Sequence, residues 1–208
     1  NSLDYEKQLR IRRTLKPSAV FKDYFNNDYP VLIYIGRIQK LKKIDLLVKA
    51  QKQLLEQDIF CNLILIGEDS DGNNIPHLVR ELGLTNYVWF YGPCYDENEI
   101  GNLIYNSDVC ITPGAIGLTT IHSLTYGTPV ITNNHISSHG PEFEAIEIGV
   151  TGDFFSLDDL EDLCQKIRAW INVGTVNRNI LRMQAYKKVD EIYNPNNQIN
   201  ILKEVLNK

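Results

Sequence analysis

The chain of 208 residues lacks the patterns that identify several large classes of protein. All of its apolar runs fall short of the roughly 18 residues that a membrane-spanning helix requires, and no signal-peptide pattern is recognisable. Internal repeats and low-complexity segments are absent as well. These absences leave a globular chain as the expectation, and 208 residues are enough to bury about 70% of the unfolded surface without disulfide staples.

Several catalytic and nucleotide-binding signatures are also missing. There is no G-x-x-x-x-G-K-[ST] phosphate loop and no G-x-G-x-x-G fingerprint, so a P-loop ATPase or an ordinary dinucleotide-binding enzyme has no support. No G-x-S-x-G pattern places a serine at a nucleophile elbow. Any nucleotide chemistry of this chain must therefore rest on other features.

Cysteine and histidine are scarce, with four residues of each. The cysteines form no C-x-x-C pair, and Cys61 and Cys110 lie in or beside apolar runs, so we expect buried free thiols and a reducing compartment. No H-E-x-x-H pattern occurs. His135 and His139 are four residues apart but lie just before Gly140, in a loop, and this spacing does not predict a metal site.

Positive charge is not in excess. The 21 Lys and Arg residues face 26 Asp and Glu residues, which gives a formal net charge of −5. This balance argues against nucleic acid as the main partner, because phosphate neutralisation needs a clustered basic surface. The negative net charge still allows the chain to bind one phosphorylated small molecule, which requires only two or three local hydrogen-bond donors.

The sequence does contain a regular alternation of strand and helix signals. Short apolar runs predict strands, and the segments between them space their apolar residues at helical intervals. Such alternation predicts a Rossmann-like α/β fold, a parallel β-sheet with helices on both faces. The predicted strands are 31–35, 62–66, 87–91, 109–111, 130–131 and 152–155.

The C-terminal third is predicted to be helical. The pattern favours two separate helices, over 157–171 and 178–192, and a last one over 198–206. Ser156 is the predicted N-cap of the first, since acidic residues follow it in the first turn.

The same signals predict three parts of the chain. Residues 1–28 form a lead-in with a helix, residues 29–190 the Rossmann-like domain, and residues 191–208 a C-terminal helix that packs back or toward another domain. The chain begins at Asn1 without methionine, which suggests a piece of a longer protein with a missing upstream part.

Residues 109–131 read as strand, glycine loop, helix and strand. The loop 112–117 leads into a predicted helix over 118–126, which Gly127 ends. A helix start presents backbone N–H groups without intrahelical partners and can hold a phosphate. Taken alone, the loop favours an ordinary βα turn over a phosphate site.

Two cations point to the same region. Arg37 directly follows the strand 31–35, and Lys42 lies five residues further on. Ligands of open parallel sheets bind at the carboxyl ends of strands, where Arg offers phosphate a bidentate fork and Lys a point charge. Both could instead belong to a solvated basic loop, but together with the helix start they predict a diphosphate site.

Several short patterns then occur in a familiar order. After Gly36-Arg37 and Lys42 come LILIGED, VWFYG, S-D-V-x-I-x-P, G-L-x-x-x-x-S-x-x-Y-G-x-P-V-I and T-G-D-F-F. Over about residues 31–171 the chain thus resembles the C-terminal half of a retaining GT-B glycosyltransferase of glycosyltransferase family 4, or group 1. The resemblance implies that this half binds the nucleotide diphosphate-sugar donor and that an N-terminal domain carries the acceptor site.

The resemblance also implies roles for single residues. Arg37 and Lys42 match the catalytic Arg and Lys that stabilise the leaving diphosphate, and the amides of Gly117 and Leu118 match those that hold the phosphate. The turn 92–94 matches the one that meets the base. The implied donor-binding residues are Gly36, Arg37, Lys42, Glu68, Gly92, Pro93, Cys94, Gly114, Gly117, Leu118, Thr119, His122 and Glu142.

One departure from the family pattern matters. The family has Glu-x7-Glu, whose first Glu contacts the sugar and whose second contacts the ribose; here these positions hold Gly114 and His122. Gly114 offers no side chain. His122 can contact a ribose hydroxyl or be a satisfied structural histidine. Glu142 matches the family's loop before the donor pocket.

The resemblance implies a hexosyltransferase-like enzyme that uses a UDP- or GDP-sugar in polysaccharide or glycolipid synthesis and is inactive as an isolated domain. It implies no cofactor and no metal, in keeping with the absence of a D-x-D pattern. The expected location is cytoplasmic. The full-length protein could also contact the inner face of the cell membrane peripherally. The alternatives are a GT-B nucleotide-sugar epimerase, whose acidic and histidine residues are not recognisable, and a non-catalytic binding domain, which Gly114 favours.

Overall fold

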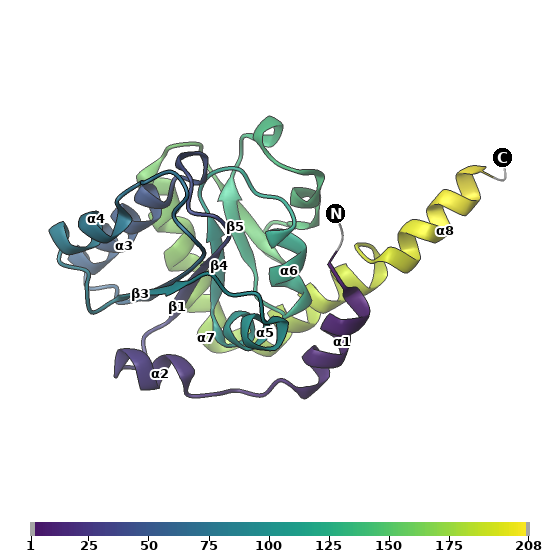
Figure 1. The fold of residues 1–208 in the computed structure, drawn as a ribbon, viewed down its shortest axis with the longest axis horizontal. Coiled ribbons are helices and arrows are strands. Elements are labelled where there is room, and N and C mark those ends of the chain that lie inside the picture. Colours follow the sequence, from purple (N-terminus) through teal and green to yellow (C-terminus); the bar gives the residue numbers. More distant parts are fainter. Residues whose placement is uncertain (1–2, 207–208) are drawn as a thin grey trace.

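The computed structural model describes residues 3–206, except for the side chains of residues 174–176. Six strands form one sheet in the order β3-β2-β1-β4-β5-β6, and every neighbouring pair is parallel (Figure 1). This confirms the predicted Rossmann-like sheet. The strands are β1 (Val31–Ile35), β2 (Asn62–Ile66), β3 (Val88–Gly92), β4 (Val109–Thr112), β5 (Val130–Asn133) and β6 (Gly152–Phe155).

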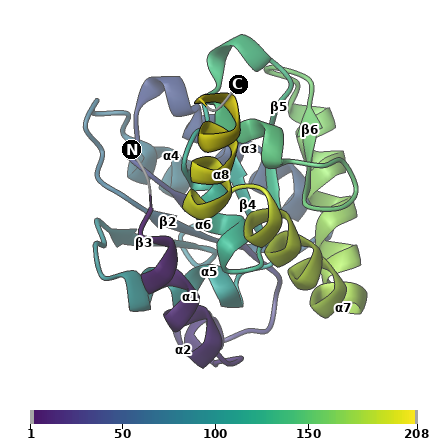
Figure 2. The same cartoon turned by 90° about the vertical axis from the view of Figure 1, so that its right-hand side faces the viewer.

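Helices cover both faces of this sheet (Figure 2). The α-helices are α1 (Tyr5–Thr14), α2 (Val20–Phe25), α3 (Ile44–Glu56), α4 (Ile75–Glu81), α5 (Glu97–Asn106), α6 (Thr119–Thr125), α7 (Leu160–Glu191) and α8 (Pro195–Leu206). Three short 3-10 turns lie in the connections: η1 (Lys40–Lys42), η2 (Ile136–Ser138) and η3 (Pro141–Ala145). Across the described residues, no helix is both long and apolar enough to cross a membrane.

The core consists of two layers that the sheet separates. Successive strand residues point to opposite faces, so Leu32 and Tyr34 of β1 pack with α3, α4 and the first part of α7. Val31 and Ile33 pack on the other face with α1, α2, α5 and α6. Because both faces are covered, the central strands β1, β2 and β4 are buried at nearly every position rather than alternating between buried and exposed residues.

The C-terminal helices follow the sequence prediction in part. Helix α7 consists of two helices that meet at a kink at Asn177, where the backbone angles are non-helical (φ −122°, ψ 19°), and this kink directly precedes the predicted start of the second helix at residue 178. The N-cap is Asp159, which accepts a hydrogen bond from the amide of Asp162. Ser156 was the wrong cap: its hydroxyl donates to the Asp162 carboxylate instead (2.9 Å), because the chain turns at Asp158 (φ 61°) before the helix starts.

The two ends of the chain are held differently. The Arg12 guanidinium of α1 pairs with Asp190 of α7 (2.7 Å) and lies over the Tyr186 ring. Helix α8, in contrast, has no buried residue and extends away from the sheet (Figure 1). Residues 1–2 and 207–208 of the predicted end segments lie outside the described residues. The division at residues 28 and 190 stays a prediction.

Candidate functional site

The carboxyl ends of β1, β2 and β3 are joined by a close backbone approach. Gly67 donates its amide to the Gly92 carbonyl (3.0 Å). It also lies so near Gly36 that a Cβ on Gly67 would be 1.9 Å from the Gly36 carbonyl oxygen, and its φ of +154° favours glycine. This packing brings Arg37 and Glu68, which follow the two glycines, to the same edge of the sheet.

The connection after β3 lies further along that edge. The thiol of Cys94 is 3.6 Å from a carboxylate oxygen of Glu99 in α5. Three strand spacings separate β3 from β4 in the sheet order, which corresponds to about 14 Å. Gly92, Pro93 and Cys94 therefore lie toward one end of this edge of the sheet, about 14 Å from the residues that follow β4.

The glycine loop, residues 113–118, packs directly on η1. The amide of Gly114 donates to the Lys42 carbonyl (3.0 Å), and that of Ala115 donates to the Leu41 carbonyl (3.3 Å). A Cβ on Gly114 would lie 1.8 Å from the Leu41 carbonyl oxygen, so this position has no room for a side chain. The Lys42 ammonium in turn donates to the Ala115 carbonyl. The structure thus brings Lys42 and the glycine loop together.

Residues from β5 and the loop after it hold the other side of the glycine loop. The buried Asn133 amide donates to the Gly114 carbonyl (3.1 Å), and the Gly140 amide donates to the Ile116 carbonyl (2.7 Å). The backbone groups of the glycine loop are therefore paired as far as the Ile116 carbonyl. A loop held on both sides in this way is preorganised.

His139 completes this support. Its Nδ1 accepts a hydrogen bond from the Ile116 amide (3.2 Å), and its Nε2 donates to the Asn133 carbonyl (2.8 Å), a pattern that requires the neutral ring. Burial, with the nearby charges of His135 and Lys42, lowers the pKa of His139, although the bond to Asn133 acts in the opposite direction. The neutral ring that the loop needs is thus the favoured form at neutral pH.

The next three amides in the chain are unpaired. Among residues 3–206, none accepts a hydrogen bond from the backbone N–H of Gly117, Leu118 or Thr119. The Thr119 hydroxyl donates to the Ile35 carbonyl (3.2 Å), which ties the start of α6 to the end of β1. Three adjacent N–H groups at a fixed helix start form a concave arrangement suited to an anion.

The Lys42 ammonium, which donates to the Ala115 carbonyl, has a second cation, Arg37, near it. Arg37 is exposed, and Lys42 is partly buried. Burial and, to a smaller extent, the positive charge of Arg37 lower the pKa of Lys42. The two side chains are thus close enough to repel each other, and a bound polyanion would turn this repulsion into attraction.

His122 has a partner that the sequence did not reveal. It is 9% exposed, and its Nε2 lies 2.9 Å from Oε1 of Glu97 at the start of α5. The same oxygen accepts hydrogen bonds from Tyr126 (2.7 Å) and Gln8 (2.9 Å). Burial opposes ionisation of Glu97, but these bonds outweigh it and lower its pKa to about 2. His122 therefore has a structural role in joining α6 to α5, and its ribose contact stays a prediction.

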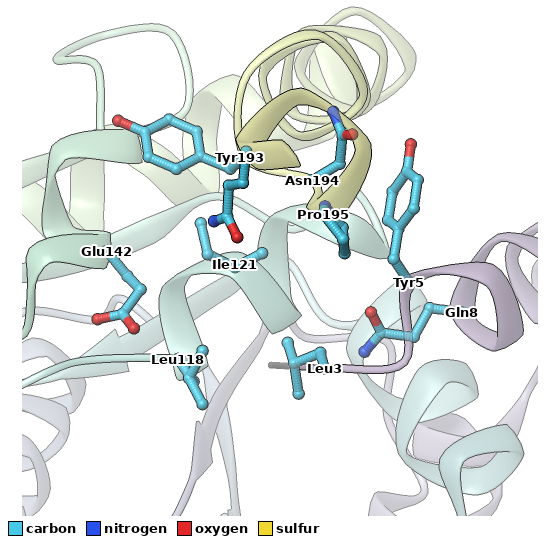
Figure 3. Close-up of a pocket in the computed structure, with 10 residues that line it drawn as sticks. Leu3, Tyr5, Gln8, Leu118, Ile121, Glu142, Tyr193, Asn194 and Pro195 are labelled. Carbon is cyan, nitrogen blue, oxygen red and sulfur yellow. The ribbon is translucent and has the colours of Figure 1, made fainter. Parts of the chain in front are cut away.

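Glu142 borders the start of α6. It is the second residue of η3 and lines a cavity of about 90 Å³ together with Leu118 and Ile121 of α6 (Figure 3). Its Oε2 is 3.6 Å from the point where a Cβ of Gly117 would lie and 2.5 Å from that of Gly140. The carboxylate thus occupies the space beside two glycines.

The sequence missed three supporting residues: Asn133, His139 and Glu97. Asn133 and His139 lie in a region without hydrophobic periodicity, and Glu97 is 25 residues from His122. No spacing rule connects such residues. In the part of the chain that the structure describes, no three His, Cys, Asp or Glu residues group as a metal site requires. Independence of metal stays a prediction.

Comparison with known proteins identifies one family. The sequence profile of the family described as "Glycosyl transferases group 1" matches residues 16–188, most of the chain. Among curated proteins, the D-inositol 3-phosphate glycosyltransferase of Corynebacterium aurimucosum is 31% identical over 110 residues, which are 49% of this chain and 26% of that protein.

Solved structures share the fold. A glycosyltransferase from Rickettsia africae superposes with a TM-score of 0.76 at 23% identity, over 94% of this chain and 54% of that one. Anabaena HepE in complex with UDP superposes with a TM-score of 0.75 at 19% identity, over 100% of this chain and 56% of that one. The chain thus spans only about half the length of these two proteins and about a quarter of the curated relative.

Proposed function

Since the chain belongs to the group 1 glycosyl transferases, we propose that it is the domain that binds the nucleotide diphosphate-sugar donor of a glycosyltransferase. The single observation that carries the proposal is the convergence of Lys42, Arg37 and the three unpaired amides of residues 117–119 at one sheet edge. Within the expected class of uridine and guanosine diphosphates, the UDP bound to the structurally similar HepE supports UDP.

The same residues suit the chemistry of sugar transfer. When the bond between the anomeric carbon and the diphosphate oxygen breaks, the diphosphate takes the electron pair and negative charge grows on its terminal phosphate. Arg37, Lys42 and the amides of residues 117–119 would bind that charge more strongly in the transition state than in the ground state. Arg37 and Lys42 would act as the catalytic cations, so the protein itself would supply the positive charge.

The arrangement across the sheet gives the donor a direction. The base would lie toward the end of β3, at Gly92, Pro93 and Cys94, and the diphosphate between β1 and β4. Glu68, at the end of β2, lies between them. We propose further that transfer proceeds with retention in polysaccharide or glycolipid synthesis, with an acceptor site on a separate N-terminal domain, and that this chain alone transfers nothing. A cytoplasmic location stays a prediction.

A second function has one observation in its favour. Gly114 replaces the family's sugar-contacting Glu and has no room for any side chain. A domain that binds nucleotide sugars without catalysing transfer would tolerate this change. Both candidates require the diphosphate site, so the first experiment tests that site.

We expect calorimetric titration to show that UDP or GDP binds this chain and that Arg37→Ala weakens binding at least tenfold, because a charge-assisted bidentate contact is lost. Arg13→Ala is the matched control, since Arg13 is exposed on α1 and away from the strand ends. Equal affinities of wild type and Arg37→Ala would reject the diphosphate site.

A further inference from the structure

The position of Glu142 carries an inference about the sugar. Within residues 3–206 its carboxylate has neither an ion-pair partner nor a hydrogen-bond donor, although the side chain is partly buried. Because the side chain is only partly buried, water hydrates the carboxylate when no ligand is bound. A carboxylate held without a partner in a cavity beside a proposed ligand site is available to that ligand.

The charge of Glu142 limits which part of the ligand it can contact. A carboxylate repels a diphosphate, so its favourable partners in a nucleotide sugar are hydroxyl groups, which donate hydrogen bonds to it. A nucleotide sugar carries hydroxyls on the ribose and on the transferred sugar. The location of Glu142 decides between the two.

The sheet order places Glu142 beyond the diphosphate. The proposed base position is at β3, the cations follow β1, and the glycine loop follows β4. Glu142 lies in the connection between β5 and β6, on the side opposite to β3. A donor that runs from base to diphosphate along this edge brings its sugar, not its ribose, to Glu142.

The glycine loop cannot supply this contact itself. A side chain at position 114 would collide with the backbone of Leu41 and Lys42, and residues 115–118 are Ala, Ile, Gly and Leu, which have no polar side chain. Glu142 is an acidic side chain that borders the loop at Gly117 and lies near Leu118, the last residue of the loop (Figure 3).

We propose that Glu142 accepts hydrogen bonds from hydroxyl groups of the donor's sugar and so determines which nucleotide sugars this chain binds. The proposal rests on the proposed function, because it requires a diphosphate between β1 and β4. To the proposed diphosphate site it adds Glu142 as the residue that contacts the sugar. It also adds the chemical class of the group contacted, a neutral polyhydroxylated sugar ring.

The test compares UDP with UDP-sugars in this 208-residue chain. A panel of UDP-glucose, UDP-galactose and UDP-N-acetylglucosamine is titrated by calorimetry, and the tightest of these is then titrated against Glu142→Gln. We expect about tenfold weaker binding of the UDP-sugar, because a charged acceptor is lost, with unchanged or slightly tighter binding of UDP. Glu144→Gln, in the same turn η3, is the matched control and should leave both affinities unchanged.

Glu142→Gln preserves the shape of the side chain, and an unchanged melting temperature shows that it folds. Equal loss for UDP and UDP-sugar, or no loss for either, would overturn the assignment while leaving the diphosphate site intact. Equal tightening of both would show that Glu142 only repels the diphosphate. Absence of UDP binding to the wild type would instead reject the proposed function, and the assignment with it.

Discussion

Replacing Gly114 by alanine is expected to destabilise the domain by about 3 kcal/mol. The new Cβ would lie 1.8 Å from the Leu41 carbonyl oxygen and 2.7 Å from Cα of Lys42. Both are backbone atoms and cannot rotate away. Overpacking of this kind costs about 1–3 kcal/mol, and the two backbone hydrogen bonds between the glycine loop and η1 would add about 1 kcal/mol each if broken.

The measurement is thermal unfolding. For a chain of this length, about 3 kcal/mol corresponds to a fall in the melting temperature of roughly 6–12 °C. Gly117→Ala is the matched control from the same loop. The nearest atom to its Cβ would be a carboxylate oxygen of Glu142 at 3.6 Å, an ordinary contact, so it should change stability little. Equal melting temperatures for the two variants would show that the loop does not pack on η1 as described.

The second large effect concerns Lys42. We expect Lys42→Met to weaken UDP binding about thirtyfold, because a hydrogen bond to a charged group contributes about 1.5–3 kcal/mol. Methionine keeps most of the length of the side chain and removes the ammonium, together with its hydrogen bond to the Ala115 carbonyl. Burial and the neighbouring Arg37 lower the pKa of Lys42, so its charge is unfavourable in the fold itself. A lysine in surroundings that disfavour its charge is expected where the protein binds an anion, because the anion would offset this cost.

Two comparisons isolate the charge effect. Binding of uridine, which has no phosphate, should not change in Lys42→Met. Lys40→Met removes a positive charge from the same turn at an exposed position and should weaken UDP binding less than threefold. Similar losses in the two variants would mean that the net charge of the turn, rather than the placed ammonium of Lys42, attracts the nucleotide.

The fold was largely predictable because its signals are local. Each strand is a short apolar run, and each glycine at a strand end marks a turn. A parallel sheet covered on both faces leaves few other arrangements of such runs. The break predicted between residues 171 and 178 appears in the structure as the kink at Asn177, which is shorter than the predicted gap because only this residue leaves the helical conformation.

The candidate site was predictable only in part. Arg37, Lys42 and the glycine loop could be identified because they follow strands directly, and parallel strands end at one edge. The residues that hold the loop, Asn133 at the end of β5 and His139 in the connection after it, act through contacts with an irregular segment, which no periodicity encodes. For the same reason the sequence could not show that Glu97 bonds to His122.

The account depends most on a diphosphate bound by the unpaired amides at the start of α6. The direct test is an NMR titration of the ¹⁵N-labelled chain with UDP, followed through the backbone amide signals of Gly117, Leu118 and Thr119. We predict that these three signals shift together and saturate at the affinity that calorimetry gives. If they stay unmoved while UDP binds, for instance with shifts confined to Ile180 and Met183 on the outer groove of α7, the diphosphate lies elsewhere and the account is contradicted.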